Sequence, residues 1–261
     1  MTMFSVLFEQ VPDGDEIYLD WILSGVGWTL FLAAAGWCLA FVIGVLVGCG
    51  RTSRNRWVTV LARLYVEIFR NIPVIVQMFL WYFVVPELLP RAWGEAMKQM
   101  APPWGNFVPA LFGLTLYTAA RVAEHIKAGI ESVPRGQRMA AASLGMTPFA
   151  TYRLVILPQA LRIVVPTLTS ELMGIFKNTS VALTIGVLEL TAQARQVSEF
   201  TFQTFQAFGI ATLLYLILAM LVYAVMRYVE RKLTIPGTHP ARPLSRRSRA
   251  RARAERVLKG A

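Results

Sequence analysis

The stretch WILSGVGWTLFLAAAGWCLAFVIGVLVGCG, which is Trp21–Gly50, decides the kind of fold that this chain adopts. It runs for 30 residues without one Asp, Glu, Lys or Arg, and a second stretch, Phe200–Met226, does so for 27 residues. About 20 apolar residues in a helix are enough to span a bilayer. Both stretches therefore predict membrane-spanning helices.

The composition of the whole chain agrees with a membrane protein. Of its 261 residues 56% are hydrophobic and only 16% are charged, with a net charge of +11, whereas a soluble domain carries about 25% charged residues. The first 20 residues hold acids and no Lys or Arg, which excludes a removable signal peptide with a basic start. Cys38 and Cys49 lie about 16 Å apart along one predicted helix, too far for a disulfide. Two histidines, His125 and His239, are too few for a metal centre.

Three weaker apolar stretches lie between the two strong ones, and each carries a few charged residues. Basic and non-basic loops alternate along the chain, which by the positive-inside rule places the N-terminus outside and the C-terminus in the cytoplasm. We therefore expect an all-α integral membrane protein with five transmembrane helices. The expected regions are an extracytoplasmic segment at 1–20, a membrane domain at 21–235 with crossings near 21–50, 57–85, 107–129, 165–187 and 204–232, and a basic cytoplasmic tail at 236–261.

The tail after Pro236 contains several prolines and then a run of arginines. Such a run is typical of a solvated, disordered tail or of contact with anionic lipid. The sequence shows no folded module that would read bases, so we do not expect a nucleic-acid partner.

The cytoplasmic segment between the third and fourth crossings begins PRGQRMAAASLGMTPF, residues 134–149. Pro134 suits the first position of a helix, and Gly145 suits the left-handed residue that ends one. Thr147 can cap a second helix that starts at Pro148 and runs until Pro158. The pattern predicts two short helices that cross at a glycine, either a connector on the membrane surface or a docking surface for a partner.

This segment resembles a signature of the membrane subunits of bacterial ABC importers. The signature is two alanines, three residues and a glycine, followed later by I-x-L-P, and it resembles Ala140, Ala141, Gly145, Ile156, Leu157 and Pro158 here. The subtype is similar to the polar amino acid permeases, and the similarity covers about residues 20 to 237. Further positions that match this subtype are Tyr65, Glu67, Phe69, Arg70, Pro73 and Gln77, then Tyr117, Ala123, Glu124, Ile126, Gly129 and Ile130, then Lys177, Ser180 and Gly186.

The resemblance implies that the short helices at 134–157 are coupling helices, which insert into a cleft of an ATP-hydrolysing subunit. Met139 stands where the signature has a Glu, so contact at that position is expected to be apolar. No phosphate-binding motif G-x-x-x-x-G-K-[ST] occurs in the chain, which places ATP and Mg on the partner and leaves this chain without a cofactor. The residues expected to couple to the ATPase are Gln137, Met139, Ala140, Ala141, Leu144, Gly145, Phe149 and Pro158.

The resemblance also implies a set of partners in the bacterial inner membrane. They are an ATPase dimer, a second permease subunit that is identical or homologous, an extracytoplasmic amino acid binding protein, the amino acid itself and membrane lipid. Five helices make a thin pore wall, which is a further reason to expect a second permease across a two-fold or pseudo-two-fold axis.

Charged residues inside the predicted crossings point to a transport site, because a charge at the centre of a membrane helix costs about 2.5 to 3.5 kcal/mol. Arg121 and Lys177 are expected at similar depth, where they can bind carboxylates, while Glu124 can bind an ammonium group. The third crossing is most similar to the glutamate/aspartate branch of the family, so we hypothesise that Arg121 reads the side-chain carboxylate of the substrate. Gly174 is expected to permit a local break in the fourth crossing. The predicted substrate pathway comprises Arg121, Glu124, Glu171, Lys177, Asn178 and Ser180.

A purely structural interpretation of the same charges stays open. Arg121 and Glu124 are three residues apart and share a helix face, so they can pair with each other. In this interpretation Glu171 pairs with some other helix, and both pairs only hold the bundle together. We interpret Arg63, Glu67 and Arg70, near the inner surface, as a structural charge network.

Other functions fit parts of the same sequence. The alternatives are an importer subunit for another polar amino acid, such as Gln, His or Arg, and an ATP-independent channel. A membrane-embedded enzyme needs a nucleophile, base or metal constellation, and neither His125 nor His239 has companions for one in the sequence. We therefore expect a permease subunit and not an enzyme.

Overall fold

The structure is a computed structural model of the whole chain, and it describes residues 4–12 and 15–233. Apart from one isolated bridge between Gln10 and Ile17, the regular structure of the described part is helical. The basic tail expected at 236–261 lies outside the described residues.

The helices follow one another with short connections. Their bounds are η1 (Ser5–Phe8), α1 (Tyr18–Arg51), α2 (Arg56–Asn71), α3 (Val74–Phe79), η2 (Leu80–Val84), α4 (Val85–Leu88), α5 (Arg91–Lys98), α6 (Trp104–Ser132), α7 (Arg135–Ser143), α8 (Pro148–Thr151), η3 (Tyr152–Ile156), α9 (Leu157–Asn178), η4 (Thr179–Ile185), α10 (Leu190–Thr201) and α11 (Thr204–Leu233).

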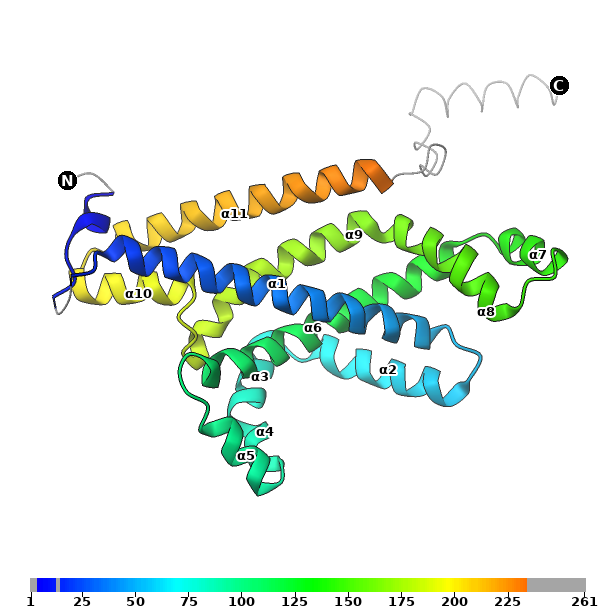
Figure 1. Cartoon of the computed structure of the whole chain (residues 1–261), viewed down its shortest axis with the longest axis horizontal. Helices are drawn as coiled ribbons and strands as arrows, with labels where there is room; N and C mark the ends of the chain where they lie inside the picture. The colour runs from blue at the N-terminus through cyan, green and yellow to red at the C-terminus, as the bar shows by residue number, and fades with distance from the viewer. Residues whose placement is uncertain (1–3, 13–14, 234–261) are drawn as a thin grey trace, which may run out of the picture.

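The long helices α1, α6, α9 and α11 run along the length of the molecule, and α2 lies beside one end of α1 and α6 (Figure 1). The helices η1 and α10 are at one end of this bundle, while α7 and α8 are at the other (Figure 1). The helices α3, α4 and α5 form an arm that projects from the side of the bundle (Figure 1).

The fold is that of an all-helical membrane protein. Three helical segments are long and apolar enough to cross a membrane, and a bent pair makes a fourth if it counts as one span. α6 is 29 residues long, but it carries charged residues through its second half and is not among these candidates. The candidates are Tyr18–Arg51, Pro148–Ile185, Thr204–Leu233 and the bent pair Arg56–Asn71 with Val74–Leu88.

The second expected crossing, 57–85, is not one straight helix. α2 ends at Asn71, and the following helical segment is bent by 105° relative to it. Ile72 is extended, with φ −86° and ψ 125°, because the residue before a proline is disfavoured in the helical region, and Pro73 has no N–H for a helical hydrogen bond.

The short helix that begins at Pro148 does not end at Pro158. Helical structure continues from Pro148 to Ile185, first as α8, then as the π-turn η3, then as α9. Pro158 is in the first turn of α9, directly after η3, and π-turns and prolines are the usual places where a long helix bends. The crossing expected at 165–187 is thus the later part of a longer helical segment.

Two helices lie in segments that the sequence predicts only as connections between crossings. α5 lies within the segment between the second and third crossings, and α10 lies between the fourth and fifth. Both are amphipathic and short, so neither has the long apolar run on which the crossings were predicted.

Small residues let α1 and α6 approach closely. A Cβ atom added at Gly44 would lie 2.5 Å from Val122 Cγ1, and one added at Gly48 would lie 2.7 Å from Ile126 Cβ. In a membrane the helices gain no hydrophobic drive from association, so close packing through small residues is what holds them together. This contact fixes the position of the α6 charges relative to α1.

Candidate functional site

Two long helices present opposite kinds of surface. The exposed face of α11 is apolar, with Leu216, Met220 and Leu221 among its exposed side chains. The exposed face of α9 and η4 is largely polar, and the polar side chains that recur along it every three to seven residues are Thr167, Ser170, Lys177 and Thr184. Polar groups on a membrane helix face a cavity or another protein rather than lipid. The polar face of α9 is therefore less suited to lipid than the apolar face of α11.

Arg121, His125 and Glu171 form a cluster between α6 and α9, called here the α6–α9 cluster. The guanidinium of Arg121 donates to both carboxylate oxygens of Glu171, with Nε–Oε2 at 2.6 Å and Nη2–Oε1 at 2.9 Å. His125 Nε2 lies 3.0 Å from Glu171 Oε1. Because a carboxylate only accepts hydrogen bonds, that nitrogen carries a proton. The side chain of Glu171 is 8% exposed and that of Arg121 is 43% exposed.

Arg51, Arg70 and Glu124 form a second cluster, called here the α1–α2–α6 cluster. Glu124 of α6 pairs with Arg51 at the end of α1, and Arg70 of α2 lies 3.3 Å from the same carboxylate oxygen. Arg70 also lies 3.8 Å from Glu67. On this side the cation Arg51 is 7% exposed and the carboxylate of Glu124 is 35% exposed.

These contacts correct the pairing that the sequence left open. Arg121 and Glu124 do not pair with each other, because each side chain reaches a different neighbouring helix. Glu124 is held by two arginines, which disfavours the expected role for it as the partner of an ammonium group. Of the expected network near the inner surface, Glu67 and Arg70 are connected, whereas Arg63 has no ion-pair partner among residues 4–12 and 15–233.

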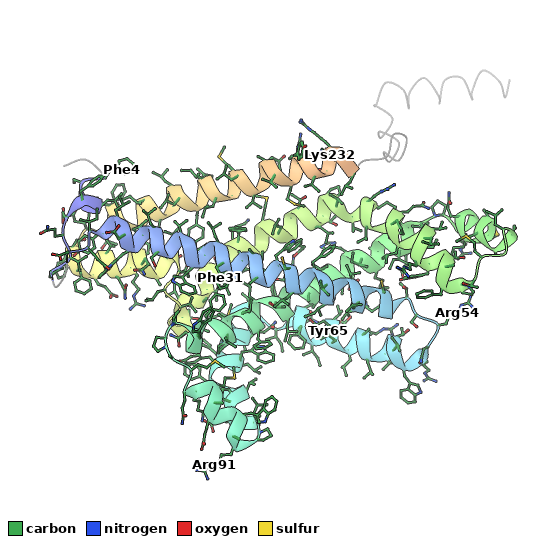
Figure 2. All side chains as sticks on the ribbon, viewed as in Figure 1. Phe4, Phe31, Arg54, Tyr65, Arg91 and Lys232 are labelled. Atoms are coloured by element: carbon green, nitrogen blue, oxygen red, sulfur yellow. The ribbon has the colours of Figure 1, made fainter. Side chains whose placement is uncertain are left out.

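Tyr65 ties α2 to α6 beside these clusters. Its hydroxyl donates to the Leu116 carbonyl at 2.8 Å, and Figure 2 shows the side chain where α2 meets the bundle. This bond fixes the end of α2 that carries Glu67 and Arg70.

Lys177 lies on the exposed face of α9 and makes no ion pair within the part of the chain that the structure describes. It is six residues from Glu171, or about 9 Å along the helix. The expected break at Gly174 is absent, because α9 continues to Asn178 and then tightens into η4. Ser180 donates its hydroxyl proton to the Lys177 carbonyl at 2.7 Å, so its side chain stabilises this change of helix type.

The turn between the two short helices at the other end of the bundle has the local geometry that the sequence predicts, whereas α7 begins at Arg135, with Pro134 just before it. Gly145 has φ +74°, in the left-handed region, and the Ala150 N–H donates to Thr147 Oγ1 at 3.2 Å. Met139, Leu144 and Phe149 are exposed large apolar side chains. The other expected coupling residues divide into two groups: Gln137 and Ala140 are exposed, whereas Ala141 and Pro158 pack against the chain itself.

Two residues of these clusters were missed in the sequence, His125 and Arg51, and so was one buried acid outside them, Glu189. His125 is one turn after Arg121, and that spacing is the signal that could have placed both on one face. Arg51 lies at the end of an apolar stretch, where a basic residue is typical of a cytoplasmic loop and does not single it out. Glu189, outside the candidate spans, is fully buried and accepts hydrogen bonds from the Thr191 and Ala192 N–H groups and the Tyr215 hydroxyl. Burial raises the pKa of the Glu189 carboxyl.

The chain is similar to known transport proteins over most of its length. Residues 40–235 match the family model described as binding-protein-dependent transport system inner membrane component. The chain belongs to this family. The permease is 42% identical over 235 residues to the glutamate/aspartate import permease protein GltJ of Escherichia coli K12, covering 90% of this chain and 96% of that one. It is 32% identical to the histidine/lysine/arginine/ornithine transport system permease protein HisM of Salmonella typhimurium, covering 80% of this chain and 88% of that one.

Solved structures give the same answer for the fold. A crystal structure of an amino acid ABC transporter with histidines has a TM-score of 0.70 and 29% identity, and the match covers 82% of this chain and 95% of that one. An inward-facing structure of the MetNI methionine ABC transporter has a TM-score of 0.67 at 21% identity, covering 83% of this chain and 98% of that one, and shows the fold alone.

The family settles several expectations. The resemblance to ABC importer membrane subunits is confirmed, and so is the location in the inner membrane. The permease is a transport component and not an enzyme. Transport in this family depends on a binding protein, and ABC transport depends on an ATPase, so both are partners of the system to which this permease belongs.

Proposed function

We propose that this permease is the translocation subunit of an ATP-driven importer of acidic amino acids, glutamate and aspartate, that works by alternating access. The observation that carries the proposal is the half-exposed guanidinium of Arg121, which lies beside the polar face of α9 and is already engaged with a carboxylate. A group that binds one carboxylate in two-point fashion has the geometry to bind another. The 42% identity to a glutamate/aspartate permease supports the same substrate class.

In this proposal Arg121 exchanges one carboxylate for another. Glu171 holds Arg121 when no substrate is present, and the substrate side-chain carboxylate takes its place during passage. His125 remains bound to Glu171 after the exchange, so the buried acid is not left without a partner. Lys177 is available to bind the second carboxylate of the substrate, because it makes no ion pair in the described residues.

The proposed topology has five crossings, with the N-terminus outside and the C-terminus in the cytoplasm. Four of these crossings are the three candidate spans and the bent pair, and α6 is the fifth. The charges of α6 are tolerated because they are paired with side chains of neighbouring helices. The polar face of α9 supports a second permease subunit, identical or homologous, across a shared axis. α7 and α8 dock on the ATPase dimer, which holds ATP and Mg.

The experiment is uptake into proteoliposomes that contain the assembled importer with its ATPase and binding protein. Radiolabelled glutamate or aspartate should accumulate only with ATP, and unlabelled glutamine, histidine or arginine should compete poorly. Preferred uptake of one of those three would replace the substrate assignment with an importer of another polar amino acid. Equal uptake without ATP would favour a channel.

The docking of α7 and α8 has a separate test. Gly145→Asp adds a Cβ to a residue with φ +74°, which a non-glycine residue adopts at a cost of about 1 to 2 kcal/mol. An added Cβ meets nothing within 4 Å in the chain itself, so the bundle should still fold. Substrate-stimulated ATPase activity should fall, and normal stimulation together with normal uptake would contradict the coupling role.

A further inference from the structure

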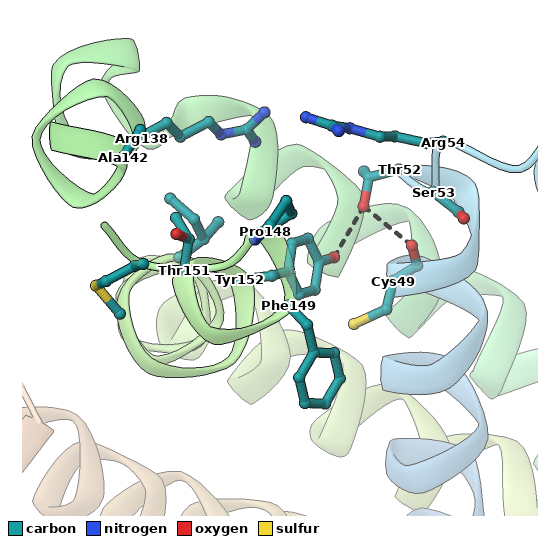
Figure 3. Close-up of a pocket in the computed structure, with 12 residues that line it drawn as sticks. Cys49, Thr52, Ser53, Arg54, Arg138, Ala142, Pro148, Phe149, Thr151 and Tyr152 are labelled. Atoms are coloured by element: carbon teal, nitrogen blue, oxygen red, sulfur yellow. Dashed lines mark hydrogen bonds between the residues drawn. The ribbon is translucent and has the colours of Figure 1, made fainter. Parts of the chain in front are cut away.

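A cavity of about 500 Å³ lies between the end of α1 and the hairpin of α7 and α8. One wall comes from the turn that joins α1 to α2, and the other from α7, α8 and η3 (Figure 3). It is separate from both carboxylate clusters of the bundle, because none of their residues lines it.

Two arginines face each other across this cavity. Figure 3 shows the guanidinium of Arg54, on the α1–α2 turn, and the guanidinium of Arg138, on α7, directed toward one another. None of the 12 lining residues is Asp or Glu. Among the described residues, Arg138 has only a long hydrogen bond to the Ile130 carbonyl, at 3.5 Å, and neither arginine has an ion-pair partner. Two like charges that face each other repel, and an anion between them converts that repulsion into attraction.

The walls of the cavity are held in place before any ligand binds. The Thr52 hydroxyl donates to the Cys49 carbonyl at 3.0 Å, and it lies 2.8 Å from the Tyr152 hydroxyl. Because the only proton of the Thr52 hydroxyl is used on Cys49, Tyr152 is the donor in the second bond. This chain of bonds joins the end of α1 to η3, so the cavity is part of the folded chain rather than a gap between loose loops.

The remaining lining side chains indicate which anion fits. Part of the cavity wall is apolar and is made by Met146, Pro148, Phe149 and Ile156. A small inorganic anion needs only the two arginines, whereas an anion that carries an apolar group also uses this part of the wall. The cavity starts close to where the apolar helix α1 ends at Arg51, which is at the cytoplasmic surface in the proposed topology. Basic pockets at that depth bind the head groups of anionic lipids, and the planar guanidinium matches phosphate oxygens.

We propose that this cavity is a binding site for a phosphate-bearing anion, and that the anion is the head group of an anionic phospholipid of the inner leaflet. The phosphate bridges Arg54 and Arg138, and the glycerol region lies against the apolar wall. A bound lipid would tie the α7–α8 hairpin to the end of α1. Anionic lipid would thereby stiffen the part of the chain through which the ATPase acts. The site does not depend on which amino acid is transported.

The test is direct lipid binding to the purified full-length permease by native mass spectrometry. Phosphatidylglycerol and phosphatidylcholine with the same acyl chains are compared on the wild type, on Arg54→Ala with Arg138→Ala, and on Arg56→Ala with Arg135→Ala. The last pair is the matched control, because it removes the same charge from positions two and three residues away that do not line the cavity. We expect the affinity for phosphatidylglycerol to fall about tenfold in the first double variant and less than about twofold in the control. Equal losses in the two double variants would overturn the proposal.

Two further variants keep the result independent of folding. Ala142→Trp fills the cavity without removing charge and should also abolish the preference for phosphatidylglycerol. Arg138→Glu places an acid opposite Arg54, so it should remove lipid binding while the melting temperature stays level or rises. Retained phosphatidylglycerol preference in both variants would contradict the site.

An experiment with inorganic phosphate distinguishes a lipid head group from a free phosphate ion as the bound anion. Line broadening of the ³¹P resonance of free phosphate that requires Arg54 and Arg138, without any phosphatidylglycerol preference, would support the anion site but overturn the lipid assignment. If the first double variant loses only binding of the ATPase and no lipid, the arginines contact protein and the proposal is wrong.

Discussion

The two carboxylate clusters of the bundle use the same chemistry with the burial reversed. In the α6–α9 cluster the acid, Glu171, is 8% exposed and its cation, Arg121, is 43% exposed. In the α1–α2–α6 cluster the cation, Arg51, is 7% exposed and the acid, Glu124, is 35% exposed. A solute that reaches the first cluster therefore meets Arg121 before Glu171. A solute that reaches the second meets Glu124 together with Arg70, which is 39% exposed, while Arg51 is buried behind them.

In the proposed function this difference favours the α6–α9 cluster as the one that binds an acidic substrate. Arg121 can leave Glu171 without stranding a buried acid, because His125 also holds Glu171. Arg51 cannot leave Glu124 for a solute, because its own side chain is buried. We therefore assign substrate binding to the first cluster, as a proposal, and a structural role to the second, which joins α1, α2 and α6.

The largest effect should come from Arg121→Ala. A hydrogen bond to a charged group contributes about 1.5 to 3 kcal/mol, so glutamate and aspartate uptake by the reconstituted importer should fall about 10- to 100-fold. Arg70→Ala, which removes a cation from the other cluster, is the matched control and should leave uptake within a few-fold of the wild type. Equal losses from the two variants would remove the distinction between the clusters.

Glu171→Gln should have a smaller and different effect. The Gln amide keeps the shape of the Glu side chain but binds Arg121 less strongly than a carboxylate does. The residue at position 171 therefore displaces the substrate carboxylate from Arg121 more slowly. The KM for glutamate and the kcat of uptake should both fall, by about three- to tenfold, the pattern expected when a ground-state competitor is removed. Glu124→Gln is the matched comparison in the α1–α2–α6 cluster. If KM and kcat fall in parallel in that variant as well, substrate contact cannot be assigned to the α6–α9 cluster.

Arg51→Met tests the structural role of the α1–α2–α6 cluster. It leaves Glu124 with Arg70 alone, and the loss of one partner of a largely buried pair should lower the free energy of unfolding by about 2 to 3 kcal/mol. The preference for glutamate over glutamine should not change. The melting temperature of the purified permease measures the first effect, and competition in vesicles measures the second; an altered preference with unchanged stability would reverse the two roles.

The smallest effect should come from Gly48→Ala. The added Cβ would lie 2.7 Å from Ile126 Cβ, so α1 must shift away from α6 and carry Arg51 away from Glu124, at a cost of about 1 to 2 kcal/mol. Gly27→Ala is the control on the same helix, because its Cβ meets nothing within 4 Å. Thermal unfolding that ranks the two variants equally would show that the contact between α1 and α6 does not set the cluster geometry.

Much of the architecture was predictable because its signals are local. The apolar runs of α1 and α11, the left-handed turn at Gly145 and the cap at Thr147 each depend on a few consecutive residues. The bend after Asn71 was equally local, since Pro73 marks it, yet the long apolar stretch around it favoured a single crossing. α10 was missed because a 12-residue helix that packs on the bundle has no long hydrophobic run.

The candidate site was predictable only as a set of residue types. Arg121, Glu124, Glu171 and Lys177 were identified as charges in apolar surroundings, which is a property of the chain near each of them. Their pairing was not predictable, because each pair joins different helices. Arg121 bonds to a residue 50 positions away, and Arg51 to one 73 positions away.

The sequence by itself determined that this is a helical membrane protein with charged residues within its apolar stretches and a hairpin of two short helices at 134–157, since hydrophobic length and turn preference belong to contiguous residues. Only the tertiary structure decided which carboxylate each arginine binds and which member of each pair is exposed. The reason is that the rotation and spacing of packed helices, fixed here by small residues such as Gly44 and Gly48, set every distance between their side chains.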